Sequence, residues 1–378
     1  MAVTETTALG ISAEAAARAR LPLERAWTLP PAAYVSETVY ALELERILRR
    51  SWIPLARLDQ IPEPGDYLSL DLAGQPVMVV HGTDGEVRVL SRVCRHRAAD
   101  IAPVSGRRKL FTCPYHAWAY DTSGRLVRAP LMESAEALEE ADCALPQIRT
   151  EIWEGFVLAN LDPGAAPLAP QIETYARYFA NFKLAELEVV RTLTWESDWN
   201  WKVLVENFME AYHHTGTHAQ SLEPDFHAAD SSVPDSDGPW SILHMPAAAH
   251  HQTTSPELIP GLTESQRRDI VAAVVFPHFM LLTFSGGVAW YQVTPHGAGR
   301  LTLNIHLCLP RSSRDLPARE AIIEGSAAAF AHVHAEDIEA NDLVWRGLNA
   351  PLTQQGRLSP LERSIWQLNQ LWLDRMGA

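Results

Sequence analysis

The order of hydrophobic and polar positions divides the chain into stretches with helical spacing and stretches with alternating spacing. Between Ser36 and Leu48, apolar residues recur at intervals of three and four behind a serine that suits an N-cap, which predicts an amphipathic helix. From Trp52 to about Leu161, short apolar or alternating runs are separated by turn residues, as at residues 83–86. This second region therefore predicts a small antiparallel β domain.

A Pro- and Ala-rich stretch at residues 162–170 marks the clearest boundary in the chain. Beyond it the pattern predicts strands and helices in alternation, and we interpret the apolar run at 270–284 as core strand. The predicted helices lie at 172–180, 263–271 and 317–348, and the strands at 188–195, 274–284, 288–294 and 300–309. Strands followed by a long helix indicate an α+β domain with the helix laid against an antiparallel sheet. Residues 1 to about 20 are expected to be mobile at their tip.

Two short motifs in the β region combine Cys with His. The first is Cys94-Arg-His96-Arg and the second is Cys113-Pro-Tyr-His116-Ala-Trp, with sixteen residues between His96 and Cys113. Two thiolates and two imidazoles can hold the two irons of a [2Fe–2S] cluster, one pair on each iron. A tetrahedral zinc site is the alternative for the same four ligands. Zinc fingers tend to pair Cys with Cys and His with His, whereas each loop here carries one of each, so the pattern favours the cluster.

A second cluster of ligand types lies in the other predicted domain. Glu210 and His213 are three apart and would share one face of a helix, and Gly216 permits a break that could turn His218 back toward them. Two His and one carboxylate on one face of an iron are typical of non-haem Fe(II) oxygenases. His214 is a local alternative to His213, and the alternative for the whole group is a set of exposed histidines on a solvated helix.

Composition narrows the function classes. Of 378 residues 47% are hydrophobic, and 31 Lys and Arg stand against 46 Asp and Glu, for a formal charge of -15. Such a charge repels nucleic-acid backbones and anionic membrane surfaces, so we expect neither as a partner. The two remaining cysteines, Cys143 and Cys308, give no disulfide pattern, no apolar run is long enough for a membrane span, and the N-terminus lacks a signal-peptide pattern. A cytoplasmic location is predicted.

The two Cys-His motifs resemble the cluster motif of the large subunits of Rieske non-haem iron oxygenases, although Ala98 and Ala117 stand where many members carry Gly. The resemblance covers residues 52 to about 348. It implies an α+β chain with a small antiparallel β Rieske domain at 52–165, a larger helix-on-sheet catalytic domain at 166–378, and an N-terminal segment, 1–51, that packs on the catalytic domain.

The resemblance also implies roles for single residues. Cys94, His96, Cys113 and His116 would hold the [2Fe–2S] cluster. His213 and His218 match the two His that bind the mononuclear Fe(II), and Asp337 matches the carboxylate ligand from a C-terminal helix. Glu336, Glu339 and Asp342 compete with Asp337 for that role. Glu210 matches the bridging carboxylate, which hydrogen-bonds the iron-ligating His in one subunit and a cluster-ligating His, here His116, in its neighbour.

Glu at position 210, where most ring-dihydroxylating relatives carry Asp, resembles the branch that oxidises quaternary ammonium compounds such as carnitine, choline and betaines. Aromatic faces hold such cations, and candidates for the pocket, which could equally be core residues, are Phe208, Tyr212, Phe284, Trp290 and Tyr291. We leave open whether Glu206 and Asn207 line the pocket or bond the backbone.

These features predict a terminal oxygenase that uses O₂ to hydroxylate or oxidatively N-dealkylate a small quaternary ammonium or amine substrate. A flavin- and iron–sulfur-containing reductase, or a ferredoxin, would bring electrons from NAD(P)H, and the subunits would form a homotrimer. Aromatic ring dihydroxylation by the same metals is the second hypothesis. A Rieske electron carrier with a binding domain is the non-enzymatic one.

Overall fold

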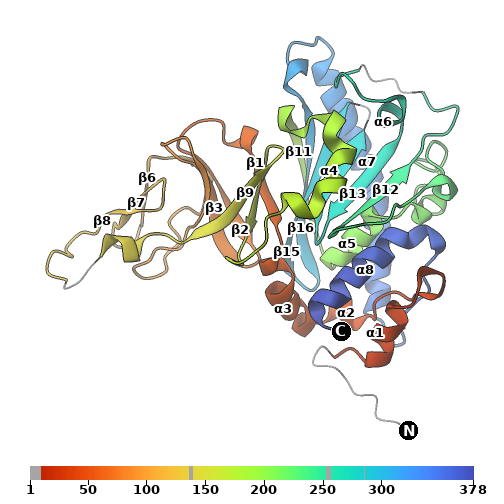
Figure 1. The fold of residues 1–378 in the computed structure, drawn as a ribbon, viewed down its shortest axis with the longest axis horizontal. Coiled ribbons are helices and arrows are strands. Elements are labelled where there is room, and N and C mark those ends of the chain that lie inside the picture. The colour runs from red at the N-terminus through yellow and green to blue at the C-terminus, as the bar shows by residue number, and fades with distance from the viewer. Residues whose placement is uncertain (1–9, 136–138, 253–256, 285) are drawn as a thin grey trace, which may run out of the picture. The chain divides into compact units, whose positions relative to one another are not determined.

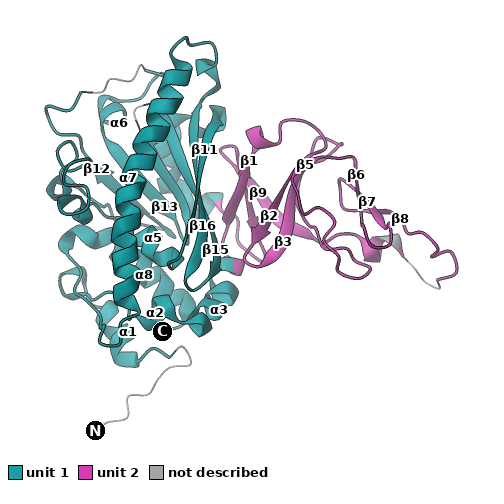
Figure 2. Ribbon diagram, turned by 180° about the vertical axis from the view of Figure 1, so that it is seen from behind, with its two compact units in different colours: residues 1–48, 169–378 teal, residues 49–168 magenta. Residues whose placement is uncertain are grey.

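The computed structural model describes residues 10–135, 139–252, 257–284 and 286–378. These residues form two compact units (Figure 2). Unit 1 comprises the described residues up to Leu48 and those from Ala169 to Ala378, and unit 2 comprises Arg49–Leu168. In the described parts of both units, every helix is too short or too polar to cross a membrane.

Unit 2 consists of two antiparallel sheets. The larger sheet has the strand order β1-β10-β9-β4-β3-β2-β5 and the smaller one β6-β7-β8. In chain order the strands are β1 (Ile53–Arg57), β2 (Asp66–Leu72), β3 (Gln75–His81), β4 (Val87–Ser91), β5 (Gly106–Arg107), β6 (Leu110–Thr112), β7 (Ala119–Asp121), β8 (Leu126–Arg128), β9 (Gln147–Trp153) and β10 (Phe156–Asn160).

The apolar run in β3 is buried on both faces of its sheet. Val77 and Val79 pack into one hydrophobic cluster, while Met78 and Val80 pack into another. Because side chains alternate along a strand, a strand covered on both sides needs a continuous apolar run. The second cluster also contains Cys94, so the core of this unit directly supports the first Cys-His motif.

Unit 1 is built on a six-stranded antiparallel sheet of order β11-β16-β15-β14-β13-β12 (Figure 1). Its strands are β11 (Leu187–Ser197), β12 (Trp240–Met245), β13 (Ile270–Val275), β14 (Phe279–Phe284), β15 (Gly287–Gly297) and β16 (Arg300–Pro310). Its helices are α1 (Ala13–Ala19), α2 (Ala32–Val35), α3 (Glu37–Arg46), α4 (Glu173–Phe179), α5 (Trp201–Phe208), α6 (Glu264–Arg268), α7 (Arg319–Leu348) and α8 (Arg363–Met376). The long helix α7 packs against β11 and β16 (Figure 2), which confirms the predicted α+β class.

The N-terminal helix prediction is also confirmed. Helix α3 begins after Ser36, whose Oγ accepts a hydrogen bond from the backbone N–H of Val39. The segment before it contains a second capped helix, α1, with Ser12 at its N-cap. The expected mobile tip at residues 1–9 lies outside the described residues.

Two predictions between residues 263 and 284 were wrong. The run 270–284 is two strands, β13 and β14, which pair with Ala273 opposite Leu281. The turn between them was missed because its residues are as buried as a strand interior: His278 is 3% exposed and Phe276 6%. The helix predicted over 263–271 is only α6, since the chain is already in β13 at Ile270. Strand β12 and helix α8 were not predicted.

Candidate metal centres

The two Cys-His motifs of unit 2 form loops with the same backbone geometry. One lies between β4 and β5 and the other between β6 and β7. In each, an Ala N–H donates to the carbonyl of the Cys four residues earlier, Ala98 to Cys94 and Ala117 to Cys113, both at 3.0 Å. The Cys N–H groups donate to Ala99 and Trp118 across the base of each loop, at 2.8 and 2.7 Å. The two halves of the motif are therefore nearly equivalent structures.

Each loop closes on an alanine in the left-handed region of backbone conformation. The φ angle is 55° at Ala98 and 58° at Ala117. Residues with a Cβ are strained there, and Gly is not. This explains why the family pattern favours Gly at the two positions where this chain departs from it.

The ligand atoms of these loops fit a Rieske cluster. Cys94 and Cys113 are buried, at 3% and 2% exposure, whereas His96 and His116 are exposed. The two imidazole rings lie 4.6 Å apart between centroids, and Trp118 stacks on His96 at 4.9 Å. Two buried thiols and two paired surface imidazoles are the donor set that a [2Fe–2S] cluster of mixed ligation needs.

Tyr120 is a supporting residue that the sequence did not reveal. Its hydroxyl lies 3.3 Å from Cys94 Sγ and accepts a hydrogen bond from the Arg95 N–H. Burial raises the pKa of Tyr120, so the phenol keeps its proton and can donate it to the sulfur. Hydrogen bonds to ligating sulfurs raise the potential of iron–sulfur clusters.

In unit 1, the segment with Glu210 and His213 is not the regular helix that the spacing suggested. Helix α5 ends at Phe208, and His213 lies in a 3₁₀ turn, Tyr212–Thr215. Glu210 holds this turn in place, because one carboxylate oxygen accepts from the His213 backbone N–H at 2.9 Å and the other lies 2.6 Å from its Nδ1. The two side chains thus meet, as predicted, by a different local structure.

His213, His218 and Asp337 come together in the structure. Each offers one ligand atom, and these atoms lie within 4.8 Å of one another. Asp337 Oδ1 lies 3.0 Å from His218 Nε2 and 3.6 Å from His213 Nε2. Within the described parts of the chain, the competing residues Glu339 and Asp342 do not join this group. Such a donor set, with two imidazoles and one carboxylate, fits a mononuclear Fe(II).

Glu336 has a role that the sequence reasoning missed. One oxygen of its carboxylate lies 2.7 Å from His218 Nδ1 and accepts from the Ser221 hydroxyl at 2.6 Å. Both ligand histidines therefore have a carboxylate on Nδ1, Glu210 for His213 and Glu336 for His218, which leaves each Nε2 facing Asp337. Carboxylates in this position fix the tautomer and the ring orientation of metal-binding histidines.

Asn207 and the ligand histidines set the charge state of Asp337. Burial alone would raise the pKa of Asp337, but the hydrogen bond from His218, the two nearby imidazoles and the Asn207 amide lower it. The Asn207 Nδ2 donates to Oδ1 at 3.1 Å. The Asp337 carboxylate is thus ionised and aligned before any metal binds. Asn207, whose role the sequence left open, holds this carboxylate in place.

A cavity of about 230 Å³ adjoins the three ligand residues. Helices α5 and α7 and strands of the sheet line it, and on α7 the lining positions Ala329, Val333 and Asp337 recur every four residues along one face. The predicted Phe208, Phe284 and Tyr291 line the cavity, together with Phe330, which was not predicted.

Two of the predicted pocket residues do not line this cavity. Tyr212 is 49% exposed, because it lies on the outer side of the 3₁₀ turn that carries His213. Trp290 is fully buried and stacks on His306 at 4.5 Å between ring centroids. Both were chosen from the sequence as aromatic residues of the second predicted domain, and residue type alone does not show which way a side chain points.

The base of α5 is anchored by a buried charged network centred on Glu43. Glu43, fully buried on α3, accepts hydrogen bonds from Lys202 and from the indole N–H groups of Trp201 and Trp372. Burial lowers the pKa of Lys202, and the Glu43 charge opposes this. The network fixes the helix from which Asn207 and Phe208 project.

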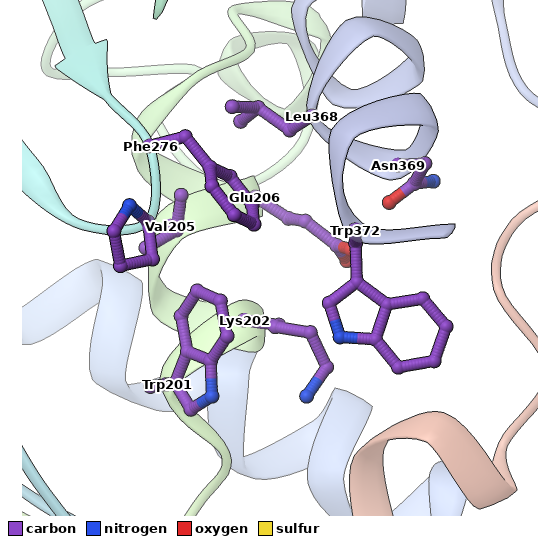
Figure 3. Close-up of a pocket in the computed structure, with 9 residues that line it drawn as sticks. Trp201, Lys202, Val205, Glu206, Phe276, Leu368, Asn369 and Trp372 are labelled. Atoms are coloured by element: carbon purple, nitrogen blue, oxygen red, sulfur yellow. The ribbon is translucent and has the colours of Figure 1, made fainter. Parts of the chain in front are cut away.

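Glu206, whose role the sequence left open, belongs to the same region and lines a small cavity of about 20 Å³ beside Lys202 and Trp372 (Figure 3). It accepts a hydrogen bond from the Tyr34 hydroxyl at 2.7 Å. Burial raises the pKa of Glu206 to about 7, although Tyr34 and Lys202 act in the opposite direction. Its carboxyl group therefore titrates near neutral pH.

Comparison with protein families identifies both halves of the chain. Residues 184–378, just over half of the chain, match the model of the ring hydroxylating alpha subunit (catalytic domain). The chain belongs to this family. Residues 51–148 match the Rieske [2Fe-2S] domain, in agreement with the two Cys-His loops.

Curated relatives of this ring-hydroxylating alpha subunit include two kinds of oxygenase. The alpha subunit of biphenyl 2,3-dioxygenase from Rhodococcus jostii (strain RHA1) is 38% identical over 209 residues, 53% of this chain and 45% of that protein. The carnitine monooxygenase oxygenase subunit from Acinetobacter baumannii is 31% identical over 191 residues, 50% of this chain and 52% of that protein. The chain thus spans about half the length of the curated relatives it matches.

Solved structures show the same fold over nearly the whole chain. The quaternary ammonium Rieske monooxygenase CntA, in complex with an inhibitor, superposes with a TM-score of 0.80 at 23% identity and covers 96% of this chain and 97% of its own. Naphthalene 1,2-dioxygenase from Rhodococcus sp., bound to indole, gives a TM-score of 0.77 at 21% identity and covers 92% of this chain and 94% of its own.

Proposed function

We propose that this chain is the terminal oxygenase component of a Rieske non-haem iron system. The observation that carries the proposal is the meeting of His213, His218 and Asp337 at the wall of an aromatic cavity. All three ligand residues line the cavity, so a substrate held there would lie against the reacting centre. An electron carrier with a binding domain could use the pocket but has no need of three metal ligands in its wall.

The two donor sets would divide the chemistry between them. Cys94 and Cys113 would hold one iron of the cluster, and His96 and His116 the other, while His213, His218 and Asp337 would hold the mononuclear iron. When bound, the cluster supplies electrons one at a time and the mononuclear Fe(II) supplies open coordination positions for O₂. The protein's own part is to orient the imidazoles through Glu210 and Glu336 and to keep water away from the substrate.

Electron delivery would follow the exposed side of the cluster loops. His96 and His116 are accessible to a partner, and we expect a flavin and iron–sulfur reductase, or a ferredoxin, to bring electrons derived from NAD(P)H. Each electron would cross by way of His116 and the bridging Glu210 to the mononuclear site at His213 of a neighbouring subunit. This route requires a ring of subunits, most simply a homotrimer, and a cytoplasmic location suits such partners.

For the substrate, we propose a small quaternary ammonium compound or amine, which would be hydroxylated or N-dealkylated. Four aromatic side chains line the cavity, and aromatic faces attract cations. The carboxylates of Glu210 and Asp337 favour positive charge in the same space. The relatives named as carnitine and quaternary ammonium monooxygenases support this choice.

Ring dihydroxylation of an uncharged arene is the second candidate. The apolar side chains of the lining, among them Leu204, Leu222, Met245 and Val333, would suit an arene, and the relative named biphenyl 2,3-dioxygenase supports it. Product analysis separates the two, because a cis-diol from an arene, without turnover of any ammonium compound, would replace the first candidate by the second.

The variant His213→Ala tests the proposal. We expect it to keep the visible spectrum of the cluster, to lose mononuclear iron and to form product at less than about a thousandth of the parent rate, because a ligand to the reacting centre is gone. His250→Ala, which removes an exposed histidine outside the cavity, is the matched control and should match the parent. A His213→Ala protein with parental activity would leave only the electron-carrier hypothesis.

A further inference from the structure

The cavity beside the metal ligands is lined without a Lys or Arg side chain. All 31 Lys and Arg lie in the part of the chain that the structure describes, and none of them is among the lining residues. Lys202 is on the same helix as Asn207 and Phe208, but its ammonium group is held by Glu43 on the other side of that helix, facing the rings of Tyr34 and Trp201. A negatively charged group in the cavity would therefore meet no counter-ion from Lys or Arg.

Apart from the Tyr291 hydroxyl and the His334 ring, the polar groups that line the cavity are carboxylates or groups already engaged with other partners. Glu210 and Asp337 contribute carboxylates, and the Asn207 amide is already engaged with Asp337. The Nδ1 of His214 lies 3.0 Å from the Phe226 carbonyl, which can only accept, so this nitrogen carries the proton. In the neutral ring Nε2 is then an acceptor.

Four aromatic rings line the cavity together with aliphatic side chains. Phe208 and Tyr291 lie 4.6 Å apart between ring centroids, and Phe330 bridges to Phe284 at 5.5 Å and to Tyr291 at 6.4 Å. The faces of such rings carry negative potential, which attracts an ammonium group and repels a carboxylate.

A bound metal does not reverse this balance. The two positive charges of Fe(II) would be matched by the carboxylates of Asp337 and Glu210, and Glu336 adds a further negative charge behind His218. The summed charge of these groups around the cavity is therefore zero or negative in the iron-loaded protein as well.

We propose that the cavity accepts alkylammonium substrates whose other end is uncharged, and that it excludes substrates that carry a carboxylate. This inference rests on the proposed function and narrows it, because carnitine, γ-butyrobetaine and glycine betaine are all zwitterions with a carboxylate, whereas choline is not. A carboxylate taken from water into this cavity would lose its hydration without gaining a charged partner, and such a group is strongly disfavoured.

The test compares pairs of substrates that share the ammonium end and differ in whether the distant end carries a carboxylate. Choline is set against glycine betaine, and the methyl esters of carnitine and γ-butyrobetaine are set against the parent acids. We expect kcat/KM, measured as product formed by the iron-loaded protein with a reductase, to be at least about 100-fold higher for each member without a carboxylate. Equal values within each pair would overturn the inference.

A pair of variants at Ile270 tests whether the lack of a positive charge in the cavity is what excludes carboxylates. This residue lines the cavity at the start of β13 and is only partly buried, so a longer side chain has access to solvent. Ile270→Lys should raise kcat/KM for the acids by at least about tenfold relative to their esters, and Ile270→Met, of similar length and no charge, should not. If the lysine variant leaves the ratio of acid to ester unchanged while choline is still turned over, missing charge is not the reason for the selection.

The same measurements separate this inference from the proposed function. If neither ammonium compounds nor arenes give product although the cluster is reduced and mononuclear iron is bound, the proposed oxygenase activity is wrong. If arenes alone give product, the oxygenase remains and the alkylammonium class is wrong. If the acids are oxidised with the same kcat/KM as the esters, only the exclusion of carboxylates is wrong.

Discussion

The cluster loops of unit 2 and the mononuclear site of unit 1 assemble their ligands in opposite ways. The cluster ligands lie on two loops of one small domain, each loop closed by the same hydrogen bond from an alanine. The mononuclear site joins His218 to Asp337 across 119 positions of sequence, with the histidines on a turn after α5 and the carboxylate on α7. A local fold therefore builds the first site, and tertiary packing builds the second.

The surroundings of the histidines differ as well. His213 and His218 each have a carboxylate on Nδ1 from within the chain. Among the residues that the structure describes, no carboxylate hydrogen-bonds His96 or His116, and both rings are exposed. The mononuclear site is thus oriented from inside the chain, whereas the cluster histidines remain free to meet a partner, as the proposed transfer between subunits requires.

The largest effect that sharpens this contrast is expected from Glu210→Gln. Both irons should stay bound, since no metal ligand is removed, but the amide cannot carry the carboxylate's charge between His116 of one subunit and His213 of the next. We expect reoxidation of the reduced cluster by O₂ in the presence of substrate to slow by about 10- to 100-fold, measured by stopped-flow absorbance.

Glu336→Gln is the matched control for this variant, because Glu336 bonds the other ligand histidine in the same way. Like Glu210→Gln, it should weaken iron binding by up to about 10- to 100-fold, but in fully iron-loaded protein it should leave reoxidation of the cluster near the parent rate. Equal slowing in both variants would mean that Glu210 only orients His213 and does not connect the two sites.

The contrast also explains what could be predicted from the sequence. The cluster ligands and the His213–His218 pair follow from short spacings, because the residues that act together are close along the chain. Glu336 could not be assigned in this way, since nothing in the sequence shows that it faces His218 rather than the metal. The buried turn at Pro277 and the orientation of Trp290 were missed for a related reason: each depends on what packs around it, and apolar composition is the same for a strand, a turn or a pocket wall.

A smaller effect concerns pH and should change the stability of unit 1 but not the cluster of unit 2. The pKa of Glu206 is raised by burial to about 7 from an ordinary value of 4.5. Protonation is therefore favoured in the folded chain, so the contribution of this group to stability is full below pH 4.5 and is lost as the pH rises through 7. Between pH 5 and pH 8 the free energy of unfolding of unit 1 should fall by on the order of 2 kcal/mol for this reason.

Glu206→Gln should remove this pH dependence, because the amide stays neutral and its oxygen can still accept from the Tyr34 hydroxyl. Denaturant unfolding at the two pH values, followed by tryptophan fluorescence, gives the difference, and Glu264→Gln on the exposed face of α6 serves as the control. A parental difference between pH 5 and pH 8 in Glu206→Gln would show that another group carries it. The absorbance of the cluster in unit 2 should follow the same curve in all three proteins.

The smallest expected effect is in the cluster loops, where the two alanines replace the glycines typical of relatives. Ala98→Gly and Ala117→Gly should each stabilise unit 2 by about 0.5 to 1 kcal/mol, since the left-handed backbone strains a residue with a Cβ. Loss of cluster absorbance on heating measures the change. Ala99→Gly is the control: its φ is not in the left-handed region, so the same substitution should destabilise by a similar amount through added freedom of the unfolded chain. Stabilisation at 98 and 117 together with destabilisation at 99 would show that the strain lies in the loops themselves, and a uniform loss at all three positions would show that packing around the cluster outweighs the backbone.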